Sequence, residues 1–271
     1  AEENNDLSIL NGCHTLDAAN PLLGTGTLHN TESAILYEAS TDTLLFACNP
    51  DQRMDPSSLA KLVTAIVAIE QADVTEIVTA DELTLSTIPK DAVSASIQAE
   101  EKMPLLDLLY CMLVGSGNDA AAVVAVHMDG SIKKFAERMN AFAVSVGCTN
   151  SNFTNPHGLH DPQHYVCAYD MALITKAALQ CDMFQTVSGT SYYEILPTEH
   201  QKDLICMYNH HKMIGKTEFQ NEEVFAGKNG YTDDAGHTLV TCAKRDDMAV
   251  IAMTIIIIGD TIPAFTAASP N

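Results

Sequence analysis

Strand-like residue patterns lie near both ends of this chain, and the stretch between them follows a helical period. Near the N-terminus, residues 34–37 and 43–47 are apolar segments around a cluster of turn-forming residues at 40–42, which predicts a hairpin. Near the C-terminus, strands are expected at 224–228, 237–243 and 248–258. Because apolar strand faces must be buried against other elements, we expect one antiparallel sheet assembled from both chain ends.

Helical patterns fill the middle of the chain. Apolar residues recur at helical spacing over 58–71, after Asp55 and Pro56, which suit an N-cap and a first helical turn. The fold class is therefore α/β of the α+β kind, with the sheet flanked by helices and a mostly helical subdomain inserted. Further helices are expected at 105–114, 119–128, 132–146 and 169–179. We assign 1–32 to an N-terminal extension and 33–271 to a single domain, whose α/β part is 33–71 plus 220–271 and whose mainly helical part is 72–219.

The charge balance excludes two classes of partner. The chain carries 14 Lys and Arg against 35 Asp and Glu, a formal net charge of -21 at pH 7, so its field repels nucleic-acid phosphates and anionic membrane surfaces. The longest apolar run, 248–258, is interrupted by Thr254 and reaches about half of the roughly 20 residues that cross a bilayer. We therefore expect neither nucleic-acid binding nor a membrane span. The first residue, Ala1, is not an initiating Met, which is compatible with earlier removal of a signal peptide.

Eight cysteines are spread along the chain without any Cys-x-x-Cys pair, which argues against a zinc ribbon or a thioredoxin-like site. We interpret most of them as small buried apolar residues. Their even number also permits disulfides in an oxidising compartment, and the sequence alone leaves their pairing and redox state open.

The first candidate for chemistry is Ser58 with Lys61, at the start of the helix expected over 58–71. Residues three apart share one helix face, so the lysine nitrogen reaches the serine hydroxyl. Ser58 needs a proton acceptor to become a nucleophile, and a Lys61 made neutral by burial or a nearby cation can be that base. The unpaired first-turn amides, that of Ser58 included, can donate to an oxyanion. A second copy of the spacing, Ser131 and Lys134, is interpreted as an ordinary helix start.

The second candidate is the loop after the helix expected at 105–114, where Ser116 stands between two glycines and Asn118 follows. The glycines permit close approach of a ligand to the backbone. Ser116 can relay a proton, and the Asn118 amide can orient Lys61 or a substrate carbonyl. The alternative is a plain interhelical turn with Asn118 as an N-cap.

The third candidate is Lys228, Asn229 and Gly230 at the end of a short apolar strand, followed by Tyr231 and Thr232. A fixed cation beside a residue without a side chain suits an extended peptide paired along a strand edge. Lys228 would attract the terminal carboxylate of that peptide, and Gly230 would leave room for its backbone. Taken alone, the first three residues are also a favourable turn signal.

In this order, on a helix start, an interhelical loop and a late strand, the three motifs resemble those of the serine penicillin-binding proteins. The resemblance is closer still to the low-molecular-mass D-alanyl-D-alanine carboxypeptidases of the Ser-x-x-Lys acyltransferase superfamily. It covers residues 33–259 and implies the β-lactamase/transpeptidase-like fold. The longer segments that carry it are 53–61, 113–121, 154–159 and 230–236.

The resemblance also implies a role for each motif residue. Ser58 would be the acylated nucleophile and Lys61 its base, and no cofactor or metal would take part. Ser116 would relay protons and Asn118 would be an orienting amide. The lysine of the third motif would hold a substrate carboxylate, and the amides of Ser58 and Tyr231 would form the oxyanion hole. The implied substrate-binding residues are Lys228, Asn229, Gly230, Tyr231 and Thr232.

The implied activity is hydrolysis of the bond between two terminal D-alanines of a peptidoglycan stem peptide, through an acyl-serine intermediate. β-Lactams would bind the same site, and the protein would be bacterial, secreted or associated with the cell envelope. One departure from the family is Asn229, which stands where Thr or Ser is usual and is expected to weaken substrate binding or turnover. The chain also ends without the β-rich domain and amphipathic anchor of many relatives, so we expect the membrane anchor not to be in this chain.

Two alternatives stay open. One is a non-hydrolytic penicillin- or peptidoglycan-binding sensor or scaffold, in which Asn229 has abolished turnover. The other is a β-lactamase, which would need an added base such as a loop Glu-x-x-Leu-Asn that the sequence lacks. A metal site at His157, His160, His164 and Asp161 is disfavoured, because two prolines prevent one regular helix face there. A Ser-His-Asp triad is disfavoured because no Gly-x-Ser-x-Gly elbow surrounds a serine.

Overall fold

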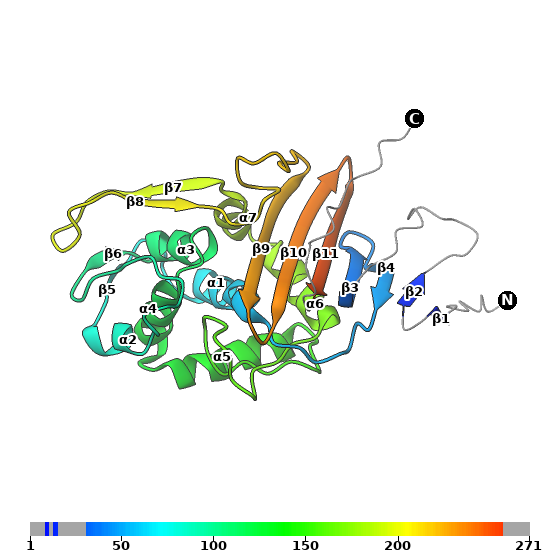
Figure 1. The fold of residues 1–271 in the computed structure, drawn as a ribbon, viewed down its shortest axis with the longest axis horizontal. Helices are drawn as coiled ribbons and strands as arrows, with labels where there is room; N and C mark the ends of the chain where they lie inside the picture. Colours follow the sequence, from blue (N-terminus) through cyan, green and yellow to red (C-terminus); the bar gives the residue numbers. More distant parts are fainter. Residues whose placement is uncertain (1–8, 11–12, 16–30, 257–271) are drawn as a thin grey trace.

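The computed structural model describes residues 9–10, 13–15 and 31–256 and contains a seven-stranded antiparallel sheet. Its strand order is β1-β2-β4-β3-β11-β10-β9, and the pairing of β3 with β11 joins the two ends of the chain (Figure 1). Strand β9 forms one edge of the sheet. The strands are β1 Ile9–Leu10, β2 Cys13–Thr15, β3 Thr31–Glu38, β4 Thr43–Cys48, β9 Val224–Thr232, β10 Gly236–Arg245 and β11 Met248–Ile256.

Helices pack behind the sheet and beyond its β9 edge (Figure 1). Helix α6 packs on β3 and β11, and α7 packs on β9. Of the helices that the structure describes, none has the length and apolar character needed to cross a bilayer. The helical elements are the 3-10 turn η1 Ser57–Leu59, α1 Ala60–Gln71, α2 Glu82–Ser86, α3 Leu105–Leu113, α4 Asn118–Asp129, α5 Ile132–Ser145, α6 Ala168–Ala178 and α7 Asp182–Gly189.

Helix α1 lies at the centre of the hydrophobic core. Every residue from 60 to 68 is buried, because α1 contacts α3, α4, α5, α6 and α7. A helix surrounded in this way carries apolar side chains on all faces instead of on one stripe. The first turn of α1 is therefore held in place by packing, and an ionisable residue within it, Lys61, is fully buried.

The sheet built from both chain ends and its helical flanks confirm the expected fold class. Several boundaries differ: β9 continues to Thr232 instead of ending at 228, β3 begins at Thr31 instead of 34, and the helix expected from Ser58 opens with the turn η1. Most of the expected extension 1–32 lies outside the described residues; its described parts are the start of β3 and strands β1 and β2, which continue the sheet beyond β4. Residues 257–271 also lie outside them.

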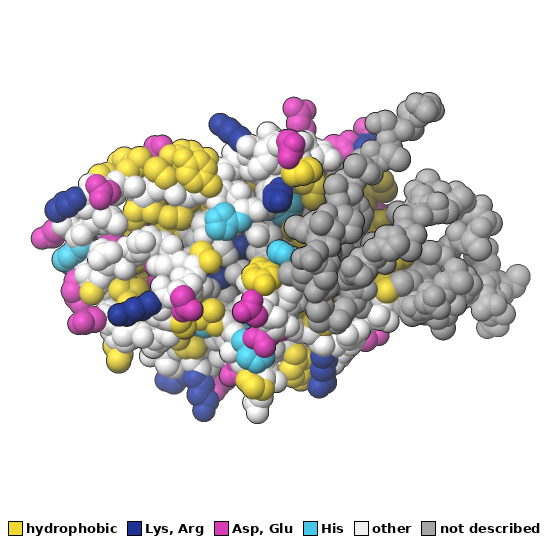
Figure 2. All heavy atoms as spheres, in the orientation of Figure 1, with side chains coloured by type: hydrophobic (Ala, Val, Ile, Leu, Met, Phe, Trp, Pro, Cys, Tyr) yellow, Lys and Arg dark blue, Asp and Glu magenta, His cyan; other side chains and the backbone are white. Residues whose placement is uncertain are grey.

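Two small antiparallel sheets of two strands each interrupt the middle region that was expected to be largely helical. Strands β5 Ile77–Thr79 and β6 Lys102–Pro104 form the first, and β7 Tyr192–Ile195 and β8 Ile205–Tyr208 form the second, which is a hairpin. Hydrophobic side chains gather over the hairpin of β7 and β8 (Figure 2). The exposed ones include Leu196, Leu204 and Tyr208.

Most cysteines with described side chains are buried free thiols, as expected for small apolar residues. Burial raises the pKa of Cys167 and of Cys242 to about 12, so both thiols stay protonated at neutral pH. Cys48 is different, because it is disulfide-bonded.

Candidate active site

Ser58 lies in the turn that leads into α1, and Asp55 fixes this turn. The Asp55 carboxylate accepts a hydrogen bond from the Ser57 amide at 2.8 Å. Ser57 has a φ of 46°, in the left-handed region that residues other than glycine seldom adopt. Three residues after Ser58, Lys61 Nζ lies 3.0 Å from Ser58 Oγ. The spacing in the sequence therefore places an amine against the hydroxyl.

Lys61 Nζ has two further oxygen neighbours. It donates to Asn118 Oδ1 at 2.7 Å and to the carbonyl oxygen of His157 at 2.6 Å. Asn118 is itself held, because its Nδ2 donates to the Val93 carbonyl at 2.9 Å. A neutral amine has two N–H bonds and one lone pair. With both N–H bonds directed at the amide and carbonyl oxygens, the lone pair is left for the hydroxyl proton of Ser58.

The loop between α3 and α4 brings a second hydroxyl to Ser58. Ser116, at a φ of 59°, places its Oγ 3.0 Å from Ser58 Oγ and 3.0 Å from Lys228 Nζ. Asn118 is the first residue of α4, whose N-cap is Gly117. The alternative in which Asn118 serves only as an N-cap is therefore wrong, since its side chain bonds Lys61 instead.

Strand β9 brings Lys228 and Gly230 to the same place. Lys228 is buried, and its Nζ donates to Ser116 Oγ and, at 2.8 Å, to the carbonyl oxygen of Asn229. A Cβ on Gly230 would lie 2.9 Å from the amide nitrogen of Ser58, so only glycine fits here. The backbone of the β9 edge thus lies directly against the Ser58 amide.

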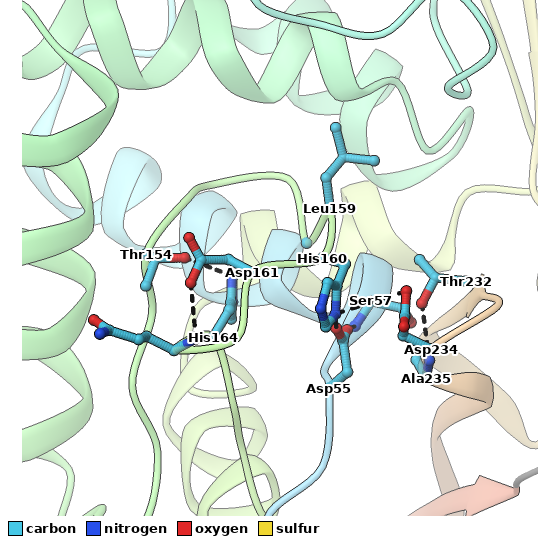
Figure 3. A network of polar contacts seen from close by, with 12 residues as sticks. Asp55, Ser57, Thr154, Leu159, His160, Asp161, His164, Thr232, Asp234 and Ala235 are labelled. Atoms are coloured by element: carbon cyan, nitrogen blue, oxygen red, sulfur yellow. Dashed lines mark hydrogen bonds and ion pairs between the residues drawn. The ribbon is translucent and has the colours of Figure 1, made fainter.

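The other residues of the third motif are placed differently. Tyr231 is 51% exposed, and its hydroxyl donates to Asp233 at 3.0 Å. Thr232 Oγ1 accepts from the Ala235 amide in the turn between β9 and β10 (Figure 3). Asn229 Oδ1 is buried and has no hydrogen-bond partner within the described part of the chain. Within the described residues, none of these three side chains forms a hydrogen bond with Ser58 or Lys61.

The electrostatics of this site lower the pKa of both lysines. Burial lowers the pKa of Lys61 well below its usual 10.5, the nearby Lys228 ammonium lowers it further, and Asp119 acts in the opposite direction. Burial also lowers the pKa of Lys228 to about 7. None of the ion pairs between described residues involves either lysine. Desolvation without a counter-charge disfavours an ammonium ion, and a neutral Lys61 is a base.

Residues 154–164 contribute a backbone group that the sequence did not reveal. Burial lowers the pKa of His157 to about 3, so its ring stays neutral while its carbonyl accepts from Lys61. Burial likewise lowers the pKa of His164 to about 4. His160 instead lies near the surface, with Nδ1 2.8 Å from Asp55 Oδ2 (Figure 3). The described residues contain no group of three or more His, Cys, Asp or Glu that could hold a metal ion.

The second copy of the Ser-x-x-Lys spacing is a helix start, as expected. Ser131 is the N-cap of α5, and its Oγ accepts from the Lys134 amide at 3.3 Å. The Lys134 side chain is exposed, so it has none of the burial that lowers the pKa of Lys61.

Comparison with known proteins identifies the family of this chain. The family model described as D-alanyl-D-alanine carboxypeptidase, peptidase S11, matches residues 21–258. The chain is 31% identical over 227 residues to D-alanyl-D-alanine carboxypeptidase DacF of Bacillus subtilis, covering 83% of this chain and 57% of that protein. It is 31% identical over 235 residues to DacA of Haemophilus influenzae, covering 83% and 56%. The chain thus spans little more than half the length of these relatives.

Solved structures share the fold. Penicillin-binding protein 5 from Haemophilus influenzae superposes with a TM-score of 0.76 at 28% identity, over 86% of this chain and 67% of that one. The Streptomyces K15 DD-transpeptidase superposes with a TM-score of 0.79 at 22% identity, over 87% and 93%. Both confirm the expected fold. Because the family model covers most of its length, the chain belongs to the peptidase S11 family of D-alanyl-D-alanine carboxypeptidases.

Proposed function

We propose that this protein is a serine D-alanyl-D-alanine carboxypeptidase acting on peptidoglycan stem peptides through an acyl-Ser58 intermediate. The observation that carries the proposal is the position of Lys61 Nζ, buried and 3.0 Å from Ser58 Oγ, with its two other neighbours both oxygen acceptors. An amine in this state is a base for the hydroxyl, and the hydroxyl becomes a nucleophile.

In the acylation step, Ser58 Oγ attacks the carbonyl carbon between the two D-alanines while Lys61 takes the hydroxyl proton. The amides of Ser58 and Tyr231 donate to the oxyanion, which the contact of Gly230 with the Ser58 amide supports. As the C–N bond breaks, the proton passes through Ser116 Oγ to the leaving amine, and D-alanine departs. Water then attacks the ester carbonyl while Lys61 accepts its proton, and Lys61 returns that proton to Ser58 Oγ as the ester bond breaks and the shortened peptide departs.

The β9 edge is the proposed substrate-binding strand. Lys228 supplies the positive charge for the terminal carboxylate of the peptide, because its Nζ lies beside Ser116 at the reacting end of the site. Asn229 offers an amide donor where the family usually has a hydroxyl. Gly230, Tyr231 and Thr232 supply the backbone along which the peptide pairs. The mechanism requires no cofactor.

The proposed enzyme works outside the cytoplasm, where peptidoglycan is built. The disulfide at Cys48 supports this location, because disulfides persist in oxidising compartments. We assign the activity to one domain, in which 33–71 and 220–271 form the α/β part and 72–219 the mainly helical part. This division is supported by the sheet, whose strands β3 and β11 come from the two outer segments.

Two substrates test the proposal. The protein is incubated with a labelled penicillin and, separately, with a peptide that ends in D-Ala-D-Ala, and the adduct and the released D-alanine are measured. We expect a covalent adduct on Ser58 and steady release of D-alanine, both absent in Ser58→Ala. The matched control is Ser131→Ala, which changes the other Ser-x-x-Lys serine and leaves both signals intact.

The unusual Asn229 keeps one alternative in view, a non-hydrolytic penicillin- or peptidoglycan-binding protein. A long-lived penicillin adduct without release of D-alanine would favour that alternative over a carboxypeptidase. Rapid turnover of penicillin would instead identify a β-lactamase. The same two measurements therefore separate all three activities.

A further inference from the structure

Ser57, the residue before the nucleophile, is in an unusual state. It is fully buried and has a positive φ of 46°, which strains the backbone of any residue with a side chain. Its hydroxyl lies 2.6 Å from Thr238 Oγ1, and Thr238 is 1% exposed. A strained conformation persists only where its surroundings hold it, so the contacts of Ser57 indicate what is being held.

The hydroxyl pair formed by Ser57 and Thr238 lies against the backbone that carries the proposed oxyanion donors. Thr238 is paired with Gly230 across strands β10 and β9. A Cβ on Gly230 would collide with Ser57 Oγ and would lie 2.6 Å from Thr238 Oγ1 and 2.9 Å from the Ser58 amide nitrogen. The pair therefore touches both chain segments that supply the proposed oxyanion donors, Ser58 and the β9 edge.

The backbone of Ser57 is anchored on its other sides. Its amide donates to Asp55, and a Cβ on Gly158 would collide with its carbonyl oxygen. Asp55, Ser57 and His160 lie close together in Figure 3, with His160 Nδ1 2.8 Å from Asp55 Oδ2. These contacts fix Ser57 to the preceding turn and to the loop of 154–164. The hydroxyl of Ser57 is the contact that ties it to the sheet.

We propose that Ser57 and Thr238 are positioning residues for the acylation step, whose hydroxyl pair sets the separation of the Ser58 and Tyr231 amides. This inference rests on the proposed acyl-serine function. Oxyanion donors act only when they are held where charge develops, and misplacement by about 1 Å costs on the order of 100-fold in rate. Neither hydroxyl touches the reacting atoms, so both act through the backbone.

The test separates acylation from binding. Thr238→Val keeps the shape of the side chain and removes the hydroxyl, and Ser57→Ala removes the other half of the pair. For each variant we expect the rate constant of acylation by a labelled penicillin to fall about 10- to 100-fold, while the dissociation constant of the noncovalent complex changes less than about threefold. Because the two groups act as one unit, the double variant should lose little more than either single variant.

Two further variants show whether the effect is positional. Thr238→Ser restores the hydroxyl and should recover most of the rate. Thr175→Val removes a buried hydroxyl that bonds within α6, away from the site, and should acylate at the wild-type rate. Thermal unfolding of every variant reports the structural effect. If Thr238→Val does not fold, Ser57→Ala and Thr238→Ser give the answer.

The outcomes distinguish this inference from the function on which it rests. A wild-type protein that forms no Ser58 adduct overturns both. A wild-type protein that acylates, with Ser57→Ala and Thr238→Val acylating equally fast, overturns only the positioning role. A fall in rate that Thr238→Ser does not recover, or that Thr175→Val reproduces, also overturns it, because a general loss of packing would then explain the data.

Discussion

Two neighbouring polar networks shift the pKa of their basic side chains in opposite directions. In the buried network, Lys61 and Lys228 donate to hydroxyl, amide and carbonyl oxygens, and the pKa of each lysine is lowered by burial. In the surface network, His160 Nδ1 lies 2.8 Å from Asp55 and 3.7 Å from Asp234 (Figure 3). The hydrogen bond to Asp55 raises the pKa of His160. Burial without a directly bonded carboxylate favours the neutral form of the two lysines. A directly bonded carboxylate near the surface favours the protonated form of His160.

The difference shows how an acidic protein keeps a neutral lysine. The chain has 35 Asp and Glu, and many lie on the surface (Figure 2). The carboxylate that acts on Lys61 belongs to Asp119, and its oxygens are already bonded by other donors. These donors include Ser94 Oγ at 2.6 Å, the Ala95 amide at 2.9 Å and the Ile97 amide at 3.1 Å. An acid satisfied by neutral donors raises the pKa of the lysine less than a direct ion pair would.

Removing the buried amine has the largest expected effect. In Lys61→Ala, Ser58 loses its base, and general bases of this kind contribute roughly 100- to 10,000-fold, so we expect acylation by penicillin to fall about 1,000-fold. Intact-mass measurement of the adduct over time gives the rate. Lys134→Ala, at the exposed copy of the motif, is the matched control and should be unaffected. An unchanged rate in Lys61→Ala would remove the base from the mechanism.

Introducing a carboxylate into the buried network should make its lysine behave like the histidine of the surface network, which keeps its proton. Asn118→Asp is almost isosteric and puts a negative charge about 2.7 Å from Lys61 Nζ, which raises the pKa of the lysine and keeps it protonated. We expect acylation at pH 7 to fall about 100-fold and its rise with pH to move to higher pH.

The control for this change is Asn140→Asp. Asn140 also donates its Nδ2 to a backbone carbonyl, that of Phe153, and accepts from the Phe153 amide. Its substitution therefore removes the same amide donor without adding charge beside Lys61. If both variants keep the wild-type pH profile, the absence of a carboxylate is not what makes Lys61 a base.

The sequence predicted those parts of the site that depend on local spacing. Ser58 and Lys61 are three residues apart at a helix start, so their contact follows from helical geometry. The contact of Ser116 with Lys228 joins residues 112 positions apart, and only the resemblance to a family placed them together. The carbonyl of His157 could not be predicted, because every residue carries a carbonyl and only the path of the loop selects this one.

The parts of the fold that could be predicted from the sequence are likewise those that depend on local patterns. The long apolar strands and the continuous helical periods gave the sheet and most helices nearly at their observed bounds. The hairpin of β7 and β8 was missed because its strands, Tyr192–Ile195 and Ile205–Tyr208, are short and lie beside polar residues. Its pairing is stabilised by tertiary contacts, such as the stacking of Tyr193 on Tyr110, that no local pattern records.

Protonation of Lys228 should have a smaller effect, which appears in the pH dependence of substrate binding. The pKa of Lys228 is lowered from 10.5 to about 7, so above that pH the free enzyme loses the ammonium that attracts the substrate carboxylate. We expect kcat/KM for a D-Ala-D-Ala peptide to fall up to about tenfold per pH unit above this pKa. Lys228→Arg keeps its charge and should lose this alkaline limb. A peptide with an amidated C-terminus lacks the carboxylate, and an alkaline limb of the same size with it would contradict the assignment.

The surface network should produce the smallest effect, and only on stability. Because the folded-state pKa of His160 lies above its usual 6.5, the pairing with Asp55 stabilises the fold below that value and is lost as pH rises through the folded-state pKa. His160 is 45% exposed, and exposed pairs contribute little. We expect His160→Gln to lower the unfolding temperature by about 1–2 °C at pH 6 and not at pH 9, with acylation changed less than about twofold. His237→Gln, on strand β10, is the histidine control. A large loss of acylation in His160→Gln would show that the surface network, and not only the buried one, sets the reactivity of Ser58.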